Sequence, residues 1–564
     1  MSSPTATTTG LDPAVHTSND NVIRRTNGPE NGSTPNDKAN AGGEPETETK
    51  RHSKKALRSK YRHVEAVHSQ SRPSCLSHDT TESPSFLGFR NLMVIVLGKH
   101  WESLPRFCLV SWPSVLTVFA VVGNLRLIIE NIQKYGVLIC IGCHDFRKSD
   151  INRGLLLYFL IPCHLFIAYI IEHYAAVQAR AERNVSASEQ NAKEHQHQDG
   201  TNSPTEEQHR KFQSTWKLVR LLHAINVTTA LVLTSYVVYY HIHHPLIGTL
   251  TEVHAIVVWL KTASYAFTNR DLRHAYLHPA RGELDALPGL YAECPYPENI
   301  TMGNLCYFWW APTLVYQPVY PRTAKIRWSF VAKRCGEVIC LSVFIWFLSA
   351  QYATPVLRNS LDKIASLDIP SIVERLLKLS TISLIIWLAG FFALFQSFLN
   401  ALAEVTRFAD RSFYDEWWNS ESLGVYWRTW NKPVYQYFKR HVYSPMRSRG
   451  WSNATASLAV FFLSAVLHEL LVGVPTHNLI GVAFLGMFLQ LPLIQFTKPL
   501  EKKTSPNGKL LGNIIFWVSF TIFGQPFAAL MYFYAWQAKY GSVSKMATSQ
   551  QLVQQGQGTC PPLV

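Results

Sequence analysis

The feature that most constrains this chain is a series of apolar blocks, each long enough to cross a lipid bilayer. A membrane-spanning helix needs about 20 predominantly apolar residues. Inside a bilayer no water bonds an unpaired backbone group, so such blocks must fold as helices. The hydropathy pattern predicts about nine spans, at 113–134, 152–175, 216–241, 247–268, 331–352, 377–402, 455–474, 477–497 and 511–536. We therefore expect an all-α polytopic membrane protein.

Composition divides the chain into three parts. Only 16% of its 564 residues are charged, against about 25% in soluble domains. Residues 1–85 are polar and basic, and they lack the apolar side chains needed to offset chain entropy, so disorder is predicted there. Residues 86–540 form the membrane domain, within which 179–211 is predicted to be a polar, disordered loop insertion. Residues 541–564 are a polar, Gln-rich C-terminal tail.

The net charge of +15 raises the possibility of nucleic-acid binding. The basic residues, however, gather at Lys50–His63 and in loops between apolar blocks, a pattern that favours the positive-inside rule instead. We therefore expect no nucleic-acid partner, a cytosolic N-terminus and, with an odd number of spans, a lumenal C-terminus. The run Lys50–His63 could bind an anionic leaflet or remain a solvated tail.

One histidine stands inside a predicted span. His468 lies within Ser457–Pro475, a stretch otherwise made of apolar and small residues. An ionisable side chain at that depth is costly, so its default interpretation is a functional site. A neutral imidazole there can act as general base toward an alcohol. For His223 and His254, a buried histidine sharing one hydrogen bond is the favoured interpretation.

The segment Phe413–Met446 combines aromatic rings with arginines and lysines. Arginine clamps phosphate oxygens and aromatic rings stack on bases, so this segment suits an adenine nucleotide that carries phosphates. A patch for anionic lipid is the alternative. Asn431 in this segment and Gln525 farther along are neutral polar residues in or beside apolar sequence, and either could hold a carbonyl oxygen or its oxyanion. For Gln525, ordinary hydrogen bonding between helices explains the residue equally well.

At these residues the chain resembles the membrane-bound O-acyltransferase family, and within it the acyl-CoA:diacylglycerol O-acyltransferases of the first type. The family motif FYxDWWN stands here as FYDEWWN, and the family's Asn–His pair stands as Asn431 and His468. The motif residues are Phe413, Tyr414, Asp415, Glu416, Trp417, Trp418 and Asn419. Glu416 replaces the family's Asp, and Tyr435 stands where the family usually has a histidine.

The resemblance implies a fold, a reaction and a set of site residues. It implies tilted spans around an intramembrane reaction chamber, in which His468 takes the proton of the diacylglycerol hydroxyl as that hydroxyl attacks acyl-CoA. Asn431 would act beside it as the second catalytic residue. The expected substrate contacts are Gln525, Gln490, Trp427, Arg440, Tyr443, Glu469 and Met487.

The resemblance also implies partners and a location. Acyl-CoA serves as co-substrate, and neither a metal nor a bound cofactor is expected. A homodimer or homotetramer in the endoplasmic reticulum membrane is expected. Two other functions stay open: a sterol O-acyltransferase, whose branch shares features at 312–328, and a lipid transporter.

Overall fold

The described part of the chain is almost entirely helical. In this computed structural model, the described residues are 62–64, 66–68, 129–138, 147–195, 205–278, 287–501 and 506–541. Among them no strand forms, and a single antiparallel bridge joins Arg322 to Phe408. The all-α membrane fold predicted from hydropathy is confirmed for these residues.

The helices follow one another in chain order with short connections. They are α4 (Lys148–Leu160), α5 (Cys163–His195), α6 (Thr205–His241), α7 (Pro245–Leu277), α8 (Met302–Trp310), α9 (Trp328–Leu348), α10 (Thr354–Arg358), α11 (Leu361–Ala365), α12 (Ile369–Phe391), α13 (Leu399–Val405), α14 (Leu423–Thr429), α15 (Lys432–Phe438), α16 (Ser444–Ser448), α17 (Asn453–Gly473), α18 (Val482–Phe488), α19 (Gln490–Glu501), α20 (Pro506–Val518) and α21 (Gln525–Trp536). Short 3-10 turns are η1 (Arg62–Val64), η5 (Gly289–Glu293) and η8 (Trp417–Asn419). Segments of π-helix are η6 (Ser349–Ala353), η7 (Phe392–Phe398), η9 (Lys439–Tyr443), η10 (Ser519–Gly524) and η11 (Gln537–Gly541).

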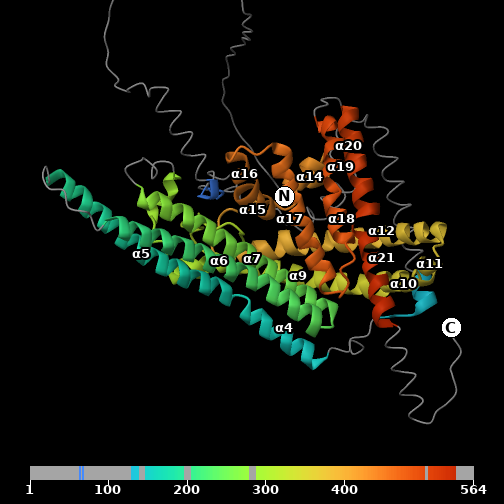
Figure 1. The fold of residues 1–564 in the computed structure, drawn as a ribbon. Helices are drawn as coiled ribbons and strands as arrows, with labels where there is room; N and C mark the ends of the chain where they lie inside the picture. The colour runs from blue at the N-terminus through green and yellow to red at the C-terminus, as the bar shows by residue number, and fades with distance from the viewer. Residues whose placement is uncertain are drawn as a thin grey trace, which may run out of the picture. The chain divides into compact units, whose positions relative to one another are not determined.

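Three groups of helices pack together (Figure 1). The first is α4 to α7, in which α5 and α6 both lie against α7. The second joins α9, η7 and α12, and α12 in turn contacts α21. The third contains α14, α17, α18 and α19, and α17 also contacts α7 of the first group. Helix α17, which carries His468, therefore lies between the first and third groups.

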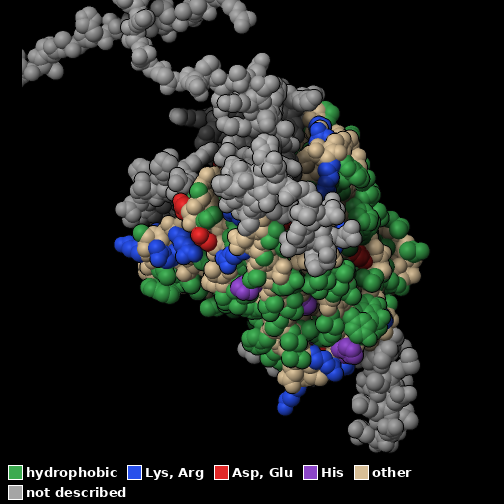
Figure 2. Space-filling view, turned by 60° about the vertical axis from the view of Figure 1, so that its left-hand side comes forward, with side chains coloured by type: hydrophobic (Ala, Val, Ile, Leu, Met, Phe, Trp, Pro, Cys, Tyr) green, Lys and Arg blue, Asp and Glu red, His purple; other side chains and the backbone are tan. Residues whose placement is uncertain are grey.

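Six helical stretches are long and apolar enough to cross a membrane, namely Lys148–Ser186, Phe212–His241, Pro245–Leu277, Ile369–Val405, Asn453–Gly473 and Leu511–Tyr540. Each coincides with a predicted span. Figure 2 shows the corresponding surface, where hydrophobic side chains cover a broad area and Lys and Arg gather toward its margins. The predicted span at 113–134 lies mostly outside the described residues, and 331–352 is helical as α9 and η6. The count of nine stays a prediction.

The predicted span at 477–497 is wrong as a single helix. The structure divides it into α18 and α19, which meet at Leu489. Pro492 in the first turn of α19 has no backbone N–H to donate to the preceding turn, so a continuous helix cannot form across this point. Hydropathy records the apolar run but not this interruption.

The expected loop at 179–211 is also corrected. Helix α5 continues to His195 and α6 begins at Thr205, so most of the insertion is helical. The segment is rich in Ala, Glu, Gln and Arg, which are strong helix formers even where nothing is buried. Contacts hold its base, because Trp216 Nε1 donates to Glu182 Oε2 at 3.0 Å and Arg183 lies 4.3 Å from the centre of the Tyr276 ring.

The prediction of disorder for 1–85 is wrong at one place. Residues 62–64 and 66–68 lie against the membrane domain, and His63 and His68 are only 6% and 5% exposed. Composition measures apolar burial, whereas this segment is held by hydrogen bonds of its histidines and backbone. The remainder of 1–85, and the tail after Gly541, lie outside the described residues.

Prolines account for three of the π-helical segments. Pro355, Pro445 and Pro526 each stand in the first turn of the helix that follows η6, η9 and η10. Because proline cannot donate its backbone nitrogen, the preceding turn loses a hydrogen bond and widens. Such single π turns are frequent at functional sites, and η10 leads directly into Gln525.

Buried charges join α5, α6 and α7. Glu172 Oε1 accepts from His223 Nε2 at 2.9 Å, and Glu172 Oε2 pairs with Arg273 Nη1 at 2.6 Å. The expectation that His223 is a buried structural histidine is confirmed. Since a buried carboxylate needs both a counter-charge and hydrogen bonds, this cluster fixes the three helices relative to one another.

Candidate active site

His468 is held by its own helix. Helix α17 begins at Ser452, whose Oγ accepts the backbone N–H of Thr455 at 3.1 Å. Four residues before His468, the carbonyl of Ser464 lies 2.7 Å from Nδ1. A carbonyl oxygen can only accept, so Nδ1 carries the proton and Nε2 keeps a free lone pair. No protein hydrogen bond to Nε2 exists among the described residues, and the imidazole is therefore set as a proton acceptor.

The face of α17 that carries His468 also contacts α14 and α19. Phe461 precedes His468 by two helical turns, which places both on one side of the helix. Its ring packs edge-on against Trp427, with 5.9 Å between the ring centroids. Trp427 Nε1 donates to Gln490 Oε1 at 3.4 Å, and Gln490 Nε2 donates to the carbonyl of Gly486 at 3.1 Å. Two predicted substrate contacts, Trp427 and Gln490, therefore lie beside the His468 face.

Asn431 caps α15. Its Oδ1 accepts the backbone N–H of Val434 at 3.2 Å. Since the oxygen is used by the cap, the amide Nδ2 remains as the donor that can point elsewhere. No hydrogen bond joins His468 to Asn431, Gln490 or Gln525 in the part of the chain that the structure describes.

The FYDEWWN motif folds back on Asn431. The backbone N–H of Lys432 donates to the carbonyl of Phe413 at 3.0 Å, and that of Asp415 donates to the carbonyl of Thr429 at 2.9 Å. The side chains of Lys432 and Asp415 also pair at 3.0 Å. These three links enclose Asn431, so the motif fixes the backbone position of the predicted catalytic asparagine.

The aromatic residues of the motif are core residues. Trp417 is fully buried, and its ring lies edge-on 5.2 Å from the rings of Trp387 and Phe391. Phe413 is also buried, and Tyr414 donates its hydroxyl to Gln396 Oε1 at 2.7 Å. The motif thereby attaches the Asn431 loop to α12 and η7.

The remaining predicted contacts lie in different settings. Arg440 is buried and donates through Nε to the carbonyl of His63 and through Nη2 to Thr268 Oγ1. The hydroxyl of Tyr443 donates to Asn453 Oδ1 at 3.3 Å, at the start of α17. Met487 is buried in α18, and Gln525 is half-buried at the start of α21.

Glu469 connects three elements. Its Oε1 accepts the backbone N–H of Gly481 at 2.9 Å, and its Oε2 accepts the N–H of Phe484 at 3.0 Å and the hydroxyl of Tyr532 at 2.7 Å. The carboxylate next to His468 therefore holds the start of α18 and the side of α21. Sequence reasoning missed this arrangement, because only the tertiary fold brings 469, 481–484 and 532 together.

These bonds lead to a prediction for Glu469. In Glu469→Ala three donors lose their acceptor, and each charge-assisted bond contributes about 1.5–3 kcal/mol. We expect a large fall in thermal stability together with loss of activity. Tyr532→Phe removes one donor and should be milder. Melting profiles of the detergent-purified variants measure both; an unchanged melting temperature for Glu469→Ala would contradict the assignment.

The described residues contain no group of three His, Cys, Asp or Glu side chains arranged to hold a metal ion. The reactive groups described above are thus an imidazole, two kinds of side-chain amide and a surrounding apolar wall. That set can move a proton and hold a carbonyl oxygen.

Comparison with known proteins places these features in a family. Residues 212–534 match the membrane-bound O-acyltransferase family. The chain is 33% identical over 480 residues to diacylglycerol O-acyltransferase 1 of Corylus americana, covering 85% of this chain and 77% of that protein. It is 34% identical over 479 residues to diacylglycerol O-acyltransferase 1A of Glycine max, covering 85% and 84%.

A third relative is more distant in length. Diacylglycerol O-acyltransferase 1 of Dictyostelium discoideum is 32% identical over 462 residues, which cover 82% of this chain and 64% of that protein. The matched region contains the whole of α14 to α19 and, with it, every side chain described around His468.

Proposed function

This chain belongs to the membrane-bound O-acyltransferase family, and we propose that it transfers an acyl group from acyl-CoA to the free hydroxyl of diacylglycerol. The products are triacylglycerol and CoA. The names of the relatives support the choice of acceptor. The observation that carries the chemistry is His468, an imidazole inside a span whose Nδ1 is bound to Ser464 O and whose Nε2 is free.

The proposed step balances at each atom. Nε2 of His468 takes the hydroxyl proton while the hydroxyl oxygen bonds to the thioester carbonyl carbon. The C–S bond then breaks, and the departing sulfur of CoA takes the proton back from the imidazolium. The Nδ2 group of Asn431, left free by the cap to Val434, donates to the carbonyl oxygen as negative charge develops there.

Gln525 and Gln490 are proposed to orient the substrates. Gln525 follows the π-helical η10 and has no hydrogen bond among the described residues. Gln490 holds the Trp427 ring against α17. The basic segment that contains Arg440 and Tyr443 is proposed to receive acyl-CoA from the cytosol, and diacylglycerol enters from the bilayer.

The setting of the enzyme is part of the proposal. The six apolar helices support a multi-pass membrane protein. Residence in the endoplasmic reticulum, a cytosolic N-terminus, a lumenal C-terminus and a homodimer or homotetramer remain predictions. Tags at either end, probed by protease protection in sealed microsomes, test the orientation.

The acceptor is tested by product analysis. Microsomes from cells that lack neutral-lipid synthesis and express this chain receive labelled oleoyl-CoA with either diacylglycerol or a sterol. We expect labelled triacylglycerol by thin-layer chromatography, because the family chemistry needs only a lipid hydroxyl at the imidazole. Label in steryl ester alone would assign the chain to sterol acylation. Lipid movement without any new ester would favour a transporter.

A further inference from the structure

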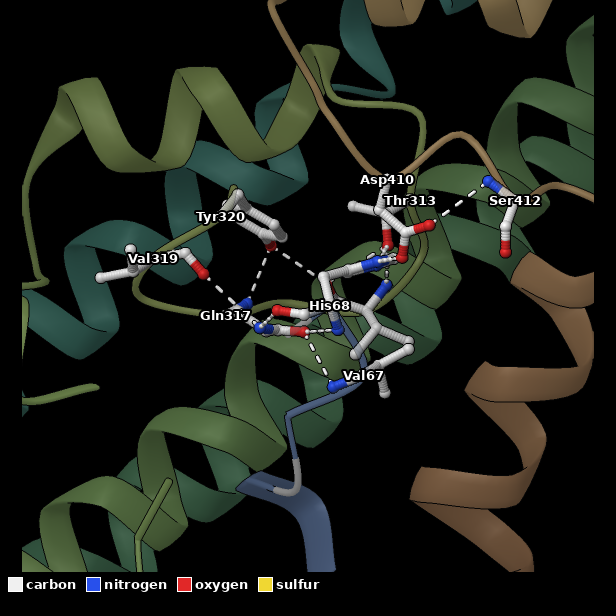
Figure 3. Close-up of polar contacts among 9 residues, drawn as sticks. Val67, His68, Thr313, Gln317, Val319, Tyr320, Asp410 and Ser412 are labelled. Carbon is white, nitrogen blue, oxygen red and sulfur yellow. Dashed lines mark hydrogen bonds and ion pairs between the residues drawn. The ribbon is translucent and has the colours of Figure 1, made fainter. Parts of the chain in front are cut away.

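A short N-terminal segment lies across the membrane domain close to the predicted catalytic loop. We call residues 62–64 and 66–68 the N-terminal strap. Figure 3 shows its second half, where Val67 and His68 contact Thr313, Gln317 and Asp410. The strap is joined to parts of the chain more than 200 residues away.

The first half of the strap is held at His63. The carbonyl of His63 accepts from Arg440 Nε and, at 3.3 Å, from Thr268 Oγ1. Its ring lies nearly parallel to that of His441, with 3.1 Å between the two Nδ1 atoms. His441 Nε2 lies 2.7 Å from Ser264 Oγ. A line of hydrogen bonds therefore runs from the strap through η9 to α7.

Both imidazoles in this line are neutral. Burial, followed by the charges of Arg270, Arg440 and Arg449, lowers the pKa of His63 to about 3. Burial and the neighbouring charges also hold the pKa of His441 well below its ordinary value. One Nδ1 therefore donates to the other, and no charge repulsion opposes the contact at neutral pH.

The second half of the strap is held at His68. The backbone N–H groups of Val67 and His68 donate to Gln317 Oε1 at 3.1 and 2.8 Å, and Gln317 Nε2 donates back to the His68 carbonyl at 3.2 Å. The His68 ring binds Asp410 Oδ2 through Nδ1 at 2.7 Å and Thr313 Oγ1 through Nε2 at 2.8 Å. With both ring nitrogens bound, the orientation of the imidazole is fixed.

The carboxylate of Asp410 is matched to this contact. Burial acts to raise its pKa, but the hydrogen bond and charge of His68, with the backbone N–H of Ser412, together hold the pKa below its ordinary value. Asp410 is therefore ionised at neutral pH and binds the His68 N–H as a charge-assisted acceptor.

These anchors lie at the two ends of the segment that carries Asn431. Asp410 stands three residues before Phe413, whose carbonyl accepts the N–H of Lys432 next to Asn431. At the other end, His441 lies in η9, which continues directly from α15. The strap thus fixes both ends of 410–441 to Thr313 and Gln317 on one side and to α7 on the other.

We propose that the N-terminal strap is a positioning element for acyl transfer, acting through Asp410 and His441 on Asn431. The inference rests on the proposed function. The strap touches neither substrate nor His468. Its loss should displace the Asn431 amide from the thioester carbonyl, and small displacements of a positioned group cost up to about 100-fold in rate.

Docking of the strap can be measured independently of activity. Trypsin cuts after arginine, and the Arg62–His63 bond lies within η1, where the His63 carbonyl is bound by Arg440 and Thr268. In the purified full-length protein this bond should resist trypsin. In His63→Ala/His68→Ala it should be cut, giving a membrane fragment that starts at residue 63. Ala66→Ser is the matched control, since Ala66 makes none of the bonds described.

Activity then tests the coupling. We expect His63→Ala/His68→Ala to lower kcat by about 10- to 100-fold, with little change in the KM for acyl-CoA and with unchanged abundance and melting temperature. His68→Ala and Asp410→Ala act on one contact, so the double variant should be no slower than the slower single variant. Additive losses would contradict that contact as the route.

The outcomes separate this inference from the proposed function. If the wild type forms no acyl ester from any acceptor, the proposed function fails while the trypsin result still reports docking. If the wild type is active, two results overturn the inference: a double variant still protected at Arg62, or one that is cut there yet turns over at the wild-type rate. A cut variant with reduced kcat supports it.

Discussion

Replacing His468 with alanine should abolish acyl transfer. General-base catalysis contributes about 10²–10⁴-fold, and His468 is the one histidine placed on the face of α17 that contacts Trp427 and Gln490 through Phe461. Its loss leaves no group beside that face to take the hydroxyl proton. The measurement is labelled triacylglycerol formed per unit of protein, with acyl-CoA saturating.

The control is a second histidine in a span. His254 in α7 stacks on Tyr158, 4.4 Å between ring centroids, away from Trp427. His254→Ala should keep most of the wild-type rate, and immunoblotting should find both variants at wild-type abundance. Ester formation by His468→Ala within about tenfold of the wild-type rate would remove the imidazole from the mechanism.

Hydropathy predicted the spans because membrane burial depends on the average character of about 20 residues. Interruptions within a span depend on single residues. The break between α18 and α19 follows from Pro492, and the π turns before Gln525 and Ser444 follow from Pro526 and Pro445. These prolines were visible in the sequence, and their effect on backbone bonding could have been used.

The predicted site residues divide by the kind of information that locates them. His468 was found because a charge-bearing group inside an apolar run is costly, and Asn431 through the family motif. The motif itself proved to be a frame for Asn431, made of backbone bonds between 413–415 and 429–432. Backbone pairing of this kind leaves no trace in residue identity.

The contacts that sequence reasoning missed are polar and distant in sequence. Glu469 joins Gly481, Phe484 and Tyr532, and His68 joins Thr313 to Asp410. Composition assigned residues 1–85 to disorder because few apolar side chains occur there. Two histidines and a few backbone groups were enough to fix one part of that region, because each found a buried partner.

Breaking the buried charge cluster of α5, α6 and α7 should have the largest effect on stability. Glu172 is fully buried and holds both Arg273 and His223. In Glu172→Ala the guanidinium of Arg273 stays buried without a counter-charge, a change that costs about 3–5 kcal/mol. We expect a markedly lower melting temperature in detergent and less protein in the membrane fraction.

A second substitution distinguishes loss of the pair from loss of packing. Replacing a whole buried ion pair by apolar residues is often neutral, whereas removing one partner is not. Glu172→Ala/Arg273→Met should therefore melt above Glu172→Ala, although it carries one more substitution. Glu374→Ala is the surface control, since Glu374 pairs with Lys378 on an exposed helix face and should leave the melting temperature unchanged. If the double variant melts below the single one, Arg273 stabilises the fold through contacts other than Glu172, such as the Trp216 ring that it overlies at 4.9 Å.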